Sequence, residues 1–191
     1  MRFLIPDTSL AWNFHELGRI DLIGGFVGRA ALQPCTAEWG LEVEREVLRL
    51  VVDAHDELQQ IFGESVKPTP TQQTATRIVR ERAFRRIGDD FRSHTGEAET
   101  IAIWSDRAGF NDTVICLTED ISFVEFCWRT REAGSLASSY ADGRQFTPVT
   151  TDDVLESCLA STLITQADKL AFVRSLRAAG RPYVGPAKNF R

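Results

Sequence analysis

Short apolar runs along the chain predict three buried strands. They are Arg2–Ile5, Val114–Leu117 and Phe146–Val149. Apolar runs of this length without polar alternation are typical of strands that are covered on both faces of a sheet. A fourth strand is expected at 31–35, where Pro34 indicates a position near an end or an edge of the sheet.

Apolar residues that recur every three or four positions predict helices between these strands. Leu10–Leu17 predicts a short helix, and Ile20–Val27 predicts a helix that ends in a loop. A long amphipathic helix follows Thr36, a residue type that caps helices, and Gly63 ends it. A second long helix is expected at about Thr71–Phe91.

The stretch Gly96–Asp120 predicts a helix, a loop and a strand, in that order. Ala98, Ile101 and Ala102 share the apolar side of the helix, and Gly109 ends it. Both ends of this unit are polar, so it can carry chemistry as well as structure.

The remaining chain predicts further helices. Ile121–Glu132 is amphipathic, Ser135–Asp142 has the composition of a loop, and Thr150 or Thr151 can cap a helix through Leu159.

The last part of the chain, 151–191, is expected to form a C-terminal helical extension. Thr165–Asp168 resembles a capping box that opens the final helix. The tail from Gly180 is basic and is expected to be loosely held.

Strands that alternate with helices predict an α/β fold with a mainly parallel sheet. We therefore expect a three-layer α/β/α architecture in a single domain over 1–191. The two long helices are expected to form a helical hairpin at 37–92, inserted in that domain.

Composition places few limits on function. The 191 residues are 43% hydrophobic and 26% charged, as in ordinary globular proteins. The formal net charge of −5 does not favour nucleic-acid binding, although local patches matter more than the sum. The four cysteines lie among apolar neighbours without metal-ligand spacing, which predicts buried reduced thiols and a cytoplasmic protein. No apolar run reaches transmembrane length, so no membrane association is expected.

Acidic residues recur where strands end and helices begin. Asp7 follows the first strand and Pro6, and Asp120 follows the strand that ends at Leu117. The carboxyl ends of parallel strands are where sites form in α/β sheets, so these two acids are expected to lie close together. Glu97 lies in the first turn of the helix between them.

This ordered set resembles the acidic quartet of PIN-domain ribonucleases. The similarity rests on the Asp7-Thr8-Ser9 opening, a glutamate in Thr36–Glu42, the helix start Gly96-Glu97-Ala98-Glu99, and Thr118-Glu119-Asp120 at a strand end. It covers roughly Phe3 to Val154. The resemblance implies a three-layer fold and an endoribonuclease with Asp7, Glu42, Glu97 and Asp120 as catalytic acids.

The resemblance also implies a cofactor and partners. Hard carboxylate ligands without a His or Cys cluster favour Mg²⁺ or Mn²⁺, with Asp7, Glu97 and Asp120 as ligands. Carboxylates about 4 Å apart repel by roughly 4 kcal/mol at an effective dielectric constant near 20, so a converging set needs a cation. RNA is the expected substrate, and a toxin role with a protein antitoxin and a homodimer are further expectations. Residues expected to support the ligands are Thr8, Ser9, Glu99 and Thr118.

Each acid has a structural alternative. Asp7 and Asp120 can act as helix N-caps, and acids such as Glu97 and Glu99 are favoured in a first helical turn by the helix dipole. The second acid is the least defined. Glu42 is preferred over Glu38, and these two can also form an exposed stripe together with Glu46.

Arginines crowd onto the second long helix. Arg82, Arg85 and Arg86 are expected to contact RNA or an acidic partner, and the alternative is a solvated helix face paired with nearby acids. His94, two residues before Gly96, is placed to contact substrate, but a surface histidine is the preferred interpretation.

Two other functions compete with the ribonuclease. One is a catalytically silent PIN-like module that binds RNA or protein. The other is a metal-dependent phosphatase, which is disfavoured because the sequence after Asp7 lacks a second Asp two residues on.

Overall fold

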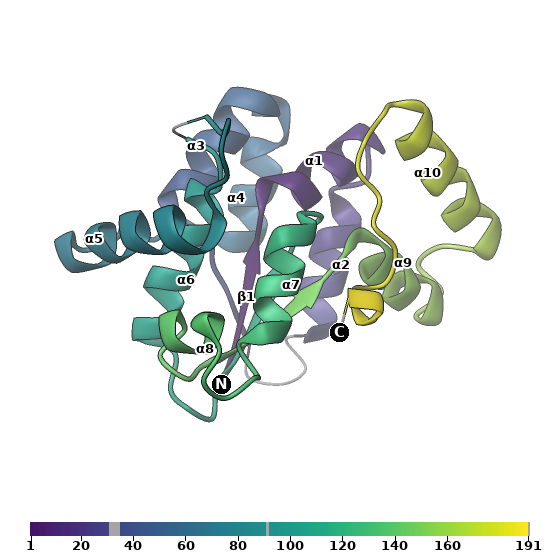
Figure 1. Cartoon of the computed structure of the whole chain (residues 1–191). Coiled ribbons are helices and arrows are strands. Elements are labelled where there is room, and N and C mark those ends of the chain that lie inside the picture. Colours follow the sequence, from purple (N-terminus) through teal and green to yellow (C-terminus); the bar gives the residue numbers. More distant parts are fainter. Residues whose placement is uncertain (31–34, 91, 191) are drawn as a thin grey trace.

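The computed structural model describes residues 1–30, 35–90 and 92–190. Four parallel strands form one sheet in the order β2-β1-β3-β4, with helices on both faces (Figure 1). The strands are β1 (Arg2–Pro6), β2 (Cys35–Ala37), β3 (Thr113–Leu117) and β4 (Gln145–Val149). The predicted three-layer α/β/α fold with a parallel sheet is confirmed. Of the strand expected at 31–35, residues 31–34 lie outside the described residues.

The register places the ends of the central strands side by side. Pro6 of β1 lies opposite Leu117 of β3, which in turn lies opposite Val149 of β4. The residues that follow Pro6 and Leu117 therefore emerge at the same edge of the sheet.

One face of the sheet is covered by α1 (Thr8–Glu16), α2 (Asp21–Ala30), α3 (Leu41–Leu50), α4 (His55–Phe62) and α9 (Thr151–Ala160). The core on this side includes Leu4 and Leu117 from the strands and Phe14, Leu58 and Leu155 from the helices. Helix α10 (Gln166–Ala178) packs against α9.

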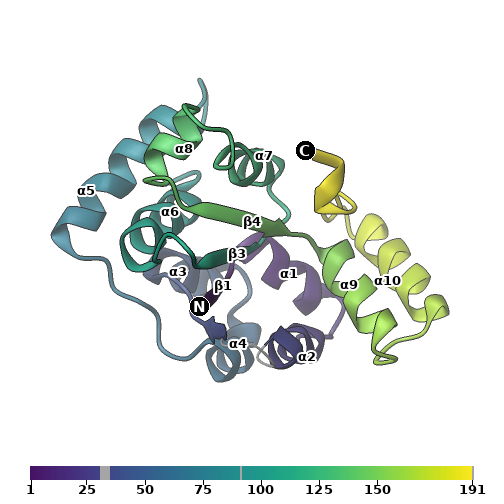
Figure 2. The same ribbon diagram turned by 90° about the horizontal axis from the view of Figure 1, so that it is seen from below.

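The other face is covered by α5 (Pro70–Val79), α6 (Thr95–Arg107), α7 (Ile121–Arg129) and α8 (Leu136–Tyr140) (Figure 2). Phe3 and Ile5 alternate with Leu4 along β1, so adjacent residues of one strand enter opposite cores. Burial on both faces explains why this strand reads as a continuous apolar run. Cys116, Cys127 and Cys158 are buried free thiols, and Cys35 is half-buried.

The first predicted long helix is broken in two. Val51 leaves the helical region with φ −144° and ψ 49°, and a short 3₁₀ turn at Val52–Ala54 separates α3 from α4. Val51 and Val52 are adjacent β-branched residues, which are poor helix formers. The helix ends at Gly63 as predicted, where φ is +74°.

The second predicted long helix ends early. After α5 comes one π-helical turn, Arg80–Phe84, and Arg85 is extended with φ −61° and ψ 131°. Phe91, the expected end of that helix, lies outside the described part of the chain.

The expected hairpin at 37–92 does not form. Helices α3 and α4 lie in one layer, whereas α5 lies in the other layer and packs mainly on α6. The connection between α4 and α5 passes the edge of the sheet, where the Val66 N–H donates to the Trp39 carbonyl at 2.8 Å. Because the connection crosses this edge, the two amphipathic segments bury their apolar sides against different cores.

Two smaller predictions are also wrong. The segment expected to be a loop at Ser135–Asp142 contains the helix α8, capped by Ser135. The tail is not loosely held, since the Val184 N–H donates to Glu119 at 3.0 Å and the Ala187 N–H donates to Asp153 at 3.0 Å. The capping box at Thr165 and Asp168 is confirmed.

Candidate metal site at the carboxyl end of the sheet

Asp7 leaves β1 at the carboxyl edge of the sheet and caps α1. Its backbone N–H donates to the Leu117 carbonyl at 2.8 Å, which fixes it beside β3. Its Oδ1 accepts the Thr8 N–H at 2.8 Å, and its Oδ2 accepts the hydroxyls of Ser9 and Thr118. Asp7 is therefore the N-cap of α1, and the residue is only 7% exposed.

Three other carboxylates act on Asp7. Glu97 comes from the first turn of α6, Glu46 from α3 and Asp120 from the N-cap of α7. Burial is the largest cause of a rise in the pKa of Asp7 to about 8, followed by the charge of Glu97, with smaller contributions from Glu46 and Asp120. The hydrogen bond from Ser9 lowers that pKa. Asp7, Glu97 and Asp120 were all selected from the sequence, and the structure brings them together.

His94 lies inside this group of acids. Its Nδ1 is 3.5 Å from Glu97 Oε1 and 3.8 Å from Asp120 Oδ2. The contact with Glu97 is the largest cause that raises the pKa of His94. Ligand atoms of His94, Glu97 and Asp120 all lie within 4.8 Å of one another.

His94 also adopts an unusual backbone conformation. Its φ of +60° lies in the left-handed region, which costs a residue with a side chain roughly 1–2 kcal/mol. The ring stacks on Phe84 with centroids 5.8 Å apart, which holds it over the site. His94 is therefore half-buried against these acids, and the contact with substrate that its position two residues before Gly96 suggests stays a prediction.

The structure does not bring Glu42 or Glu38 into the group. Glu42 pairs with Arg45, and Glu38 accepts from Arg107 at 2.9 Å. Glu46, one turn beyond Glu42, is the acid of α3 that affects the pKa of Asp7. Burial is the largest cause that raises the pKa of Glu46, and the charge of Glu97 raises it further.

Glu99 is turned toward α3 instead of the acid group. Its Oε1 accepts the Glu42 N–H at 2.8 Å and so caps α3, whose own N-cap residue is Gly40. A Cβ at position 40 would lie 2.6 Å from this oxygen, so the close approach requires glycine. Burial is the largest cause that raises the pKa of Glu99 to about 7.

The donor set fits a hard divalent cation. Asp7, Glu46, Glu97 and Asp120 offer carboxylate oxygens, which Mg²⁺ and Mn²⁺ prefer, and the His94 nitrogen suits Mn²⁺ better than Mg²⁺. The Thr8 hydroxyl, next to Asp7, is buried and lies close enough to Glu46 to lower its pKa.

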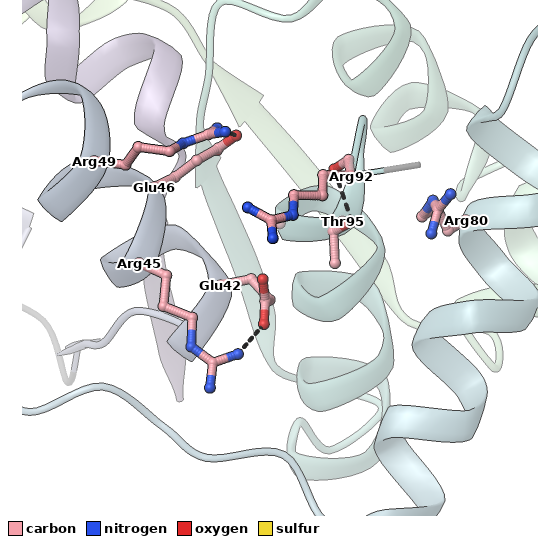
Figure 3. Close-up of a pocket in the computed structure, with 8 residues that line it drawn as sticks. Glu42, Arg45, Glu46, Arg49, Arg80, Arg92 and Thr95 are labelled. Atoms are coloured by element: carbon pink, nitrogen blue, oxygen red, sulfur yellow. Dashed lines mark hydrogen bonds and ion pairs between the residues drawn. The ribbon is translucent and has the colours of Figure 1, made fainter. Parts of the chain in front are cut away.

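The predicted arginines lie elsewhere. Arg82, Arg85 and Arg86 are exposed, with Arg85 paired to Glu81 at 2.6 Å and Arg86 within 3.4 Å of the Ser122 hydroxyl. A different set of arginines lines a pocket beside Glu46 (Figure 3). No local pattern in the sequence indicates this pocket, because its members come from separate elements.

Comparisons of the chain with protein-family models, with characterised proteins and with solved structures gave no match. Across the described part of the chain, none of the helices has both the length and the apolar character that crossing a membrane would require.

Proposed function

We propose that this protein is a metal-dependent endoribonuclease of the PIN type, with Mg²⁺ or Mn²⁺ as its cofactor. The observation that carries the proposal is the cluster of Glu97, Asp120 and His94, whose ligand atoms lie within 4.8 Å of one another. Asp7 and Glu46 are near enough for the charge of Glu97 to act on both of them. The choice of RNA rests on the resemblance of the Asp7-Thr8-Ser9 and Thr118-Glu119-Asp120 segments to PIN-domain ribonucleases. We also propose, from the same resemblance, that the protein is a toxin with a protein antitoxin and that it forms a homodimer.

The acids need a cation to coexist in their ionised forms. In the metal-free protein the pKa of Asp7 is raised to about 8, so this carboxyl holds a proton at neutral pH. A bound cation favours the ionised carboxylate by direct attraction. Asp7, Glu97 and Asp120 are the proposed ligands, and Glu46 replaces Glu42 as the fourth acid.

When bound, the cation supplies Lewis-acid stabilisation of a phosphodiester and activation of a water molecule for in-line attack. The residues around it fix the ligands. Ser9 and Thr118 donate to Oδ2 of Asp7, which orients the carboxylate and favours its ionised form. The contact with Glu97 is the largest cause that raises the pKa of His94, which lies beside the proposed ligands.

The test is cleavage of labelled single-stranded RNA in Mg²⁺, in Mn²⁺ and in EDTA. We expect cleavage only with metal, and single-stranded DNA of the same sequence should be cut more slowly. Asp7→Asn keeps the shape of the side chain but removes a ligand charge, so the rate should fall by more than about 100-fold. The matched control is Asp53→Asn, which makes the same chemical change at an exposed position outside the acid group.

Activity must be compared with fold and with metal binding. Metal-free Asp7→Asn should unfold at the same or a higher denaturant concentration than wild type, because wild type must take up a proton at Asp7 to fold at neutral pH and the amide need not. If wild type cleaves no RNA in either metal, and Asp7→Asn binds Mn²⁺ as wild type does, the nuclease proposal fails. The catalytically silent binding module would then replace it.

A further inference from the structure

A pocket of about 500 Å³ opens beside the acid group, between α3 and the segment that leads into α6 (Figure 3). Its volume falls within the usual range for small-molecule sites. The charged residues that line it are Arg45, Glu42, Glu46 and Arg49 from α3, Arg80 from the end of α5, and Arg92 from the segment before α6.

The pocket is continuous with the proposed metal site. Glu46 lines the pocket and also affects the pKa of Asp7. Gly96 lines the pocket too, and the next residue is Glu97. A group bound in the pocket would therefore lie next to a phosphodiester bound at the acids.

The charge of the pocket opposes that of the whole chain. The chain carries a formal charge of −5, but the pocket has four arginines against two glutamates. Arg80 is largely buried, with a side chain 14% exposed. One terminal nitrogen of its guanidinium pairs with Glu81 at 3.3 Å, and its Nε has no hydrogen-bond partner among the described residues. A buried guanidinium with an unused donor indicates a place for an acceptor.

We propose that this pocket binds a phosphate group of the RNA strand adjacent to the scissile phosphodiester, an inference that rests on the proposed function. Guanidinium groups match phosphate oxygens in bidentate geometry. No aromatic side chain is among the described residues that line the pocket, so it has no platform on which a base could stack. The pocket therefore recognises the backbone of the strand and not the identity of the adjacent base.

The experiment measures binding of a short fluorescent single-stranded RNA in EDTA over a series of KCl concentrations. The main variant is Arg45→Ala with Arg49→Ala, whose side chains are 61% and 52% exposed, so the fold should be kept. We expect a loss of affinity of about tenfold at low salt. The slope of log affinity against log salt should become shallower by about 1.4, since each phosphate contact to a single strand contributes about 0.7.

The matched control is Arg82→Ala with Arg86→Ala, which removes the same charge from exposed positions outside the pocket. This pair should change the slope by less than half as much. A second variant, Arg80→Lys, keeps the charge but loses the guanidinium fork, and its affinity should fall several-fold while its unfolding midpoint is unchanged.

The proposal is overturned if the pocket variants keep the affinity and slope of wild type. It is also overturned if the control pair loses as much as the pocket pair, or if wild type shows no salt-dependent binding. Because every measurement is made without metal, a failure of RNA cleavage in Mg²⁺ or Mn²⁺ would not affect these results. The two proposals can therefore fail separately.

Discussion

Asp7 and Glu119 are both buried carboxylates that follow neighbouring strands, β1 and β3, yet their surroundings differ. Glu119 is 2% exposed and accepts two backbone N–H groups, from Thr151 at the start of α9 and from Val184 in the tail. Asp7 accepts hydrogen bonds on both oxygens, from the Thr8 N–H and from the hydroxyls of Ser9 and Thr118, and faces three other acids. The residue between them is Ser9, which accepts the Glu119 N–H at 2.9 Å and donates to Asp7.

The comparison shows that burial of an acid does not by itself indicate chemistry. Burial is the largest cause that raises the pKa of both residues. For Glu119 the next causes are hydrogen bonds, which lower the pKa and stabilise the charge. For Asp7 the next cause is another acid, which the fold itself does not neutralise. Hydrogen bonds from the protein therefore stabilise the charge of Glu119, whereas the charge of Asp7 needs a bound cation to offset the neighbouring acids.

The largest expected effect is a dependence of metal-free stability on pH. The pKa of Asp7 is 3.8 when unfolded and about 8 when folded, so between these values the folded state holds a proton that the unfolded state has lost. The contribution of Asp7 to stability is therefore full below about pH 4 and falls as pH rises, by up to about 1.4 kcal/mol per pH unit. Urea unfolding of metal-free protein from pH 5 to pH 8 would measure this loss.

Asp7→Asn should make that pH dependence shallower, and saturating Mn²⁺ should reverse the loss of stability in wild type. Some dependence should remain in the variant, because burial also raises the pKa of Glu99 and Glu119. An equal slope in wild type and Asp7→Asn would contradict the assignment of the proton to Asp7.

The next effect concerns the structural acid. Glu119→Gln puts an amide NH₂ where one backbone N–H needs an acceptor, so the free energy of unfolding should fall by about 1–3 kcal/mol. Metal-free Asp7→Asn should show no such loss. Mn²⁺ affinity, measured calorimetrically on the folded protein, should stay near that of wild type in Glu119→Gln. A variant that lost metal binding but not stability would reverse the roles assigned to the two acids.

The sequence predicted the part of this site that depends on local signals. Asp7 and Asp120 follow short apolar runs, and the parallel sheet then places both at one edge. The choice among Glu38, Glu42 and Glu46 depends on where α3 begins, and it begins at Leu41 and not directly after Thr36. No local pattern fixes this start, because Gly40 has no capping side chain and Glu99 supplies the cap from a distant helix.

Contacts between residues that are distant in the sequence also explain why some predictions of the fold were wrong. The amphipathic period of 37–92 correctly predicts buried faces but does not say which core each face enters. The path of the chain decides that, where the connection runs past Trp39 and forms a β-bridge between Gly40 and Val66 at the sheet edge. The tail was misjudged for a similar reason, since its composition is basic but its backbone is held by Glu119 and Asp153.

Glu46 and Glu42 offer a sharper test of the acid group. Glu46→Gln should weaken Mn²⁺ binding by about tenfold or more, because it removes a charge that acts on Asp7 and Glu97. Glu42→Gln is the matched control, one turn earlier on α3 and paired with Arg45, and it should bind Mn²⁺ like wild type. The reverse ranking would return Glu42 to the site as the sequence suggested.

The smallest effect is expected at Ser9, which lies between Asp7 and Glu119. Its hydroxyl lowers the pKa of Asp7, so Ser9→Ala should raise that pKa further and let protons compete better with the cation. The pH at which Mn²⁺ binding is half-maximal should then rise by up to about one unit. Stability should fall by only about 1 kcal/mol, because the Glu119 N–H loses its acceptor while the Glu119 carboxylate keeps both of its donors. Ser139→Ala, an exposed serine on α8, serves as the control and should change neither quantity. If Ser9→Ala loses stability but keeps the pH dependence of metal binding, Ser9 only supports the backbone at Glu119 and does not affect the metal site.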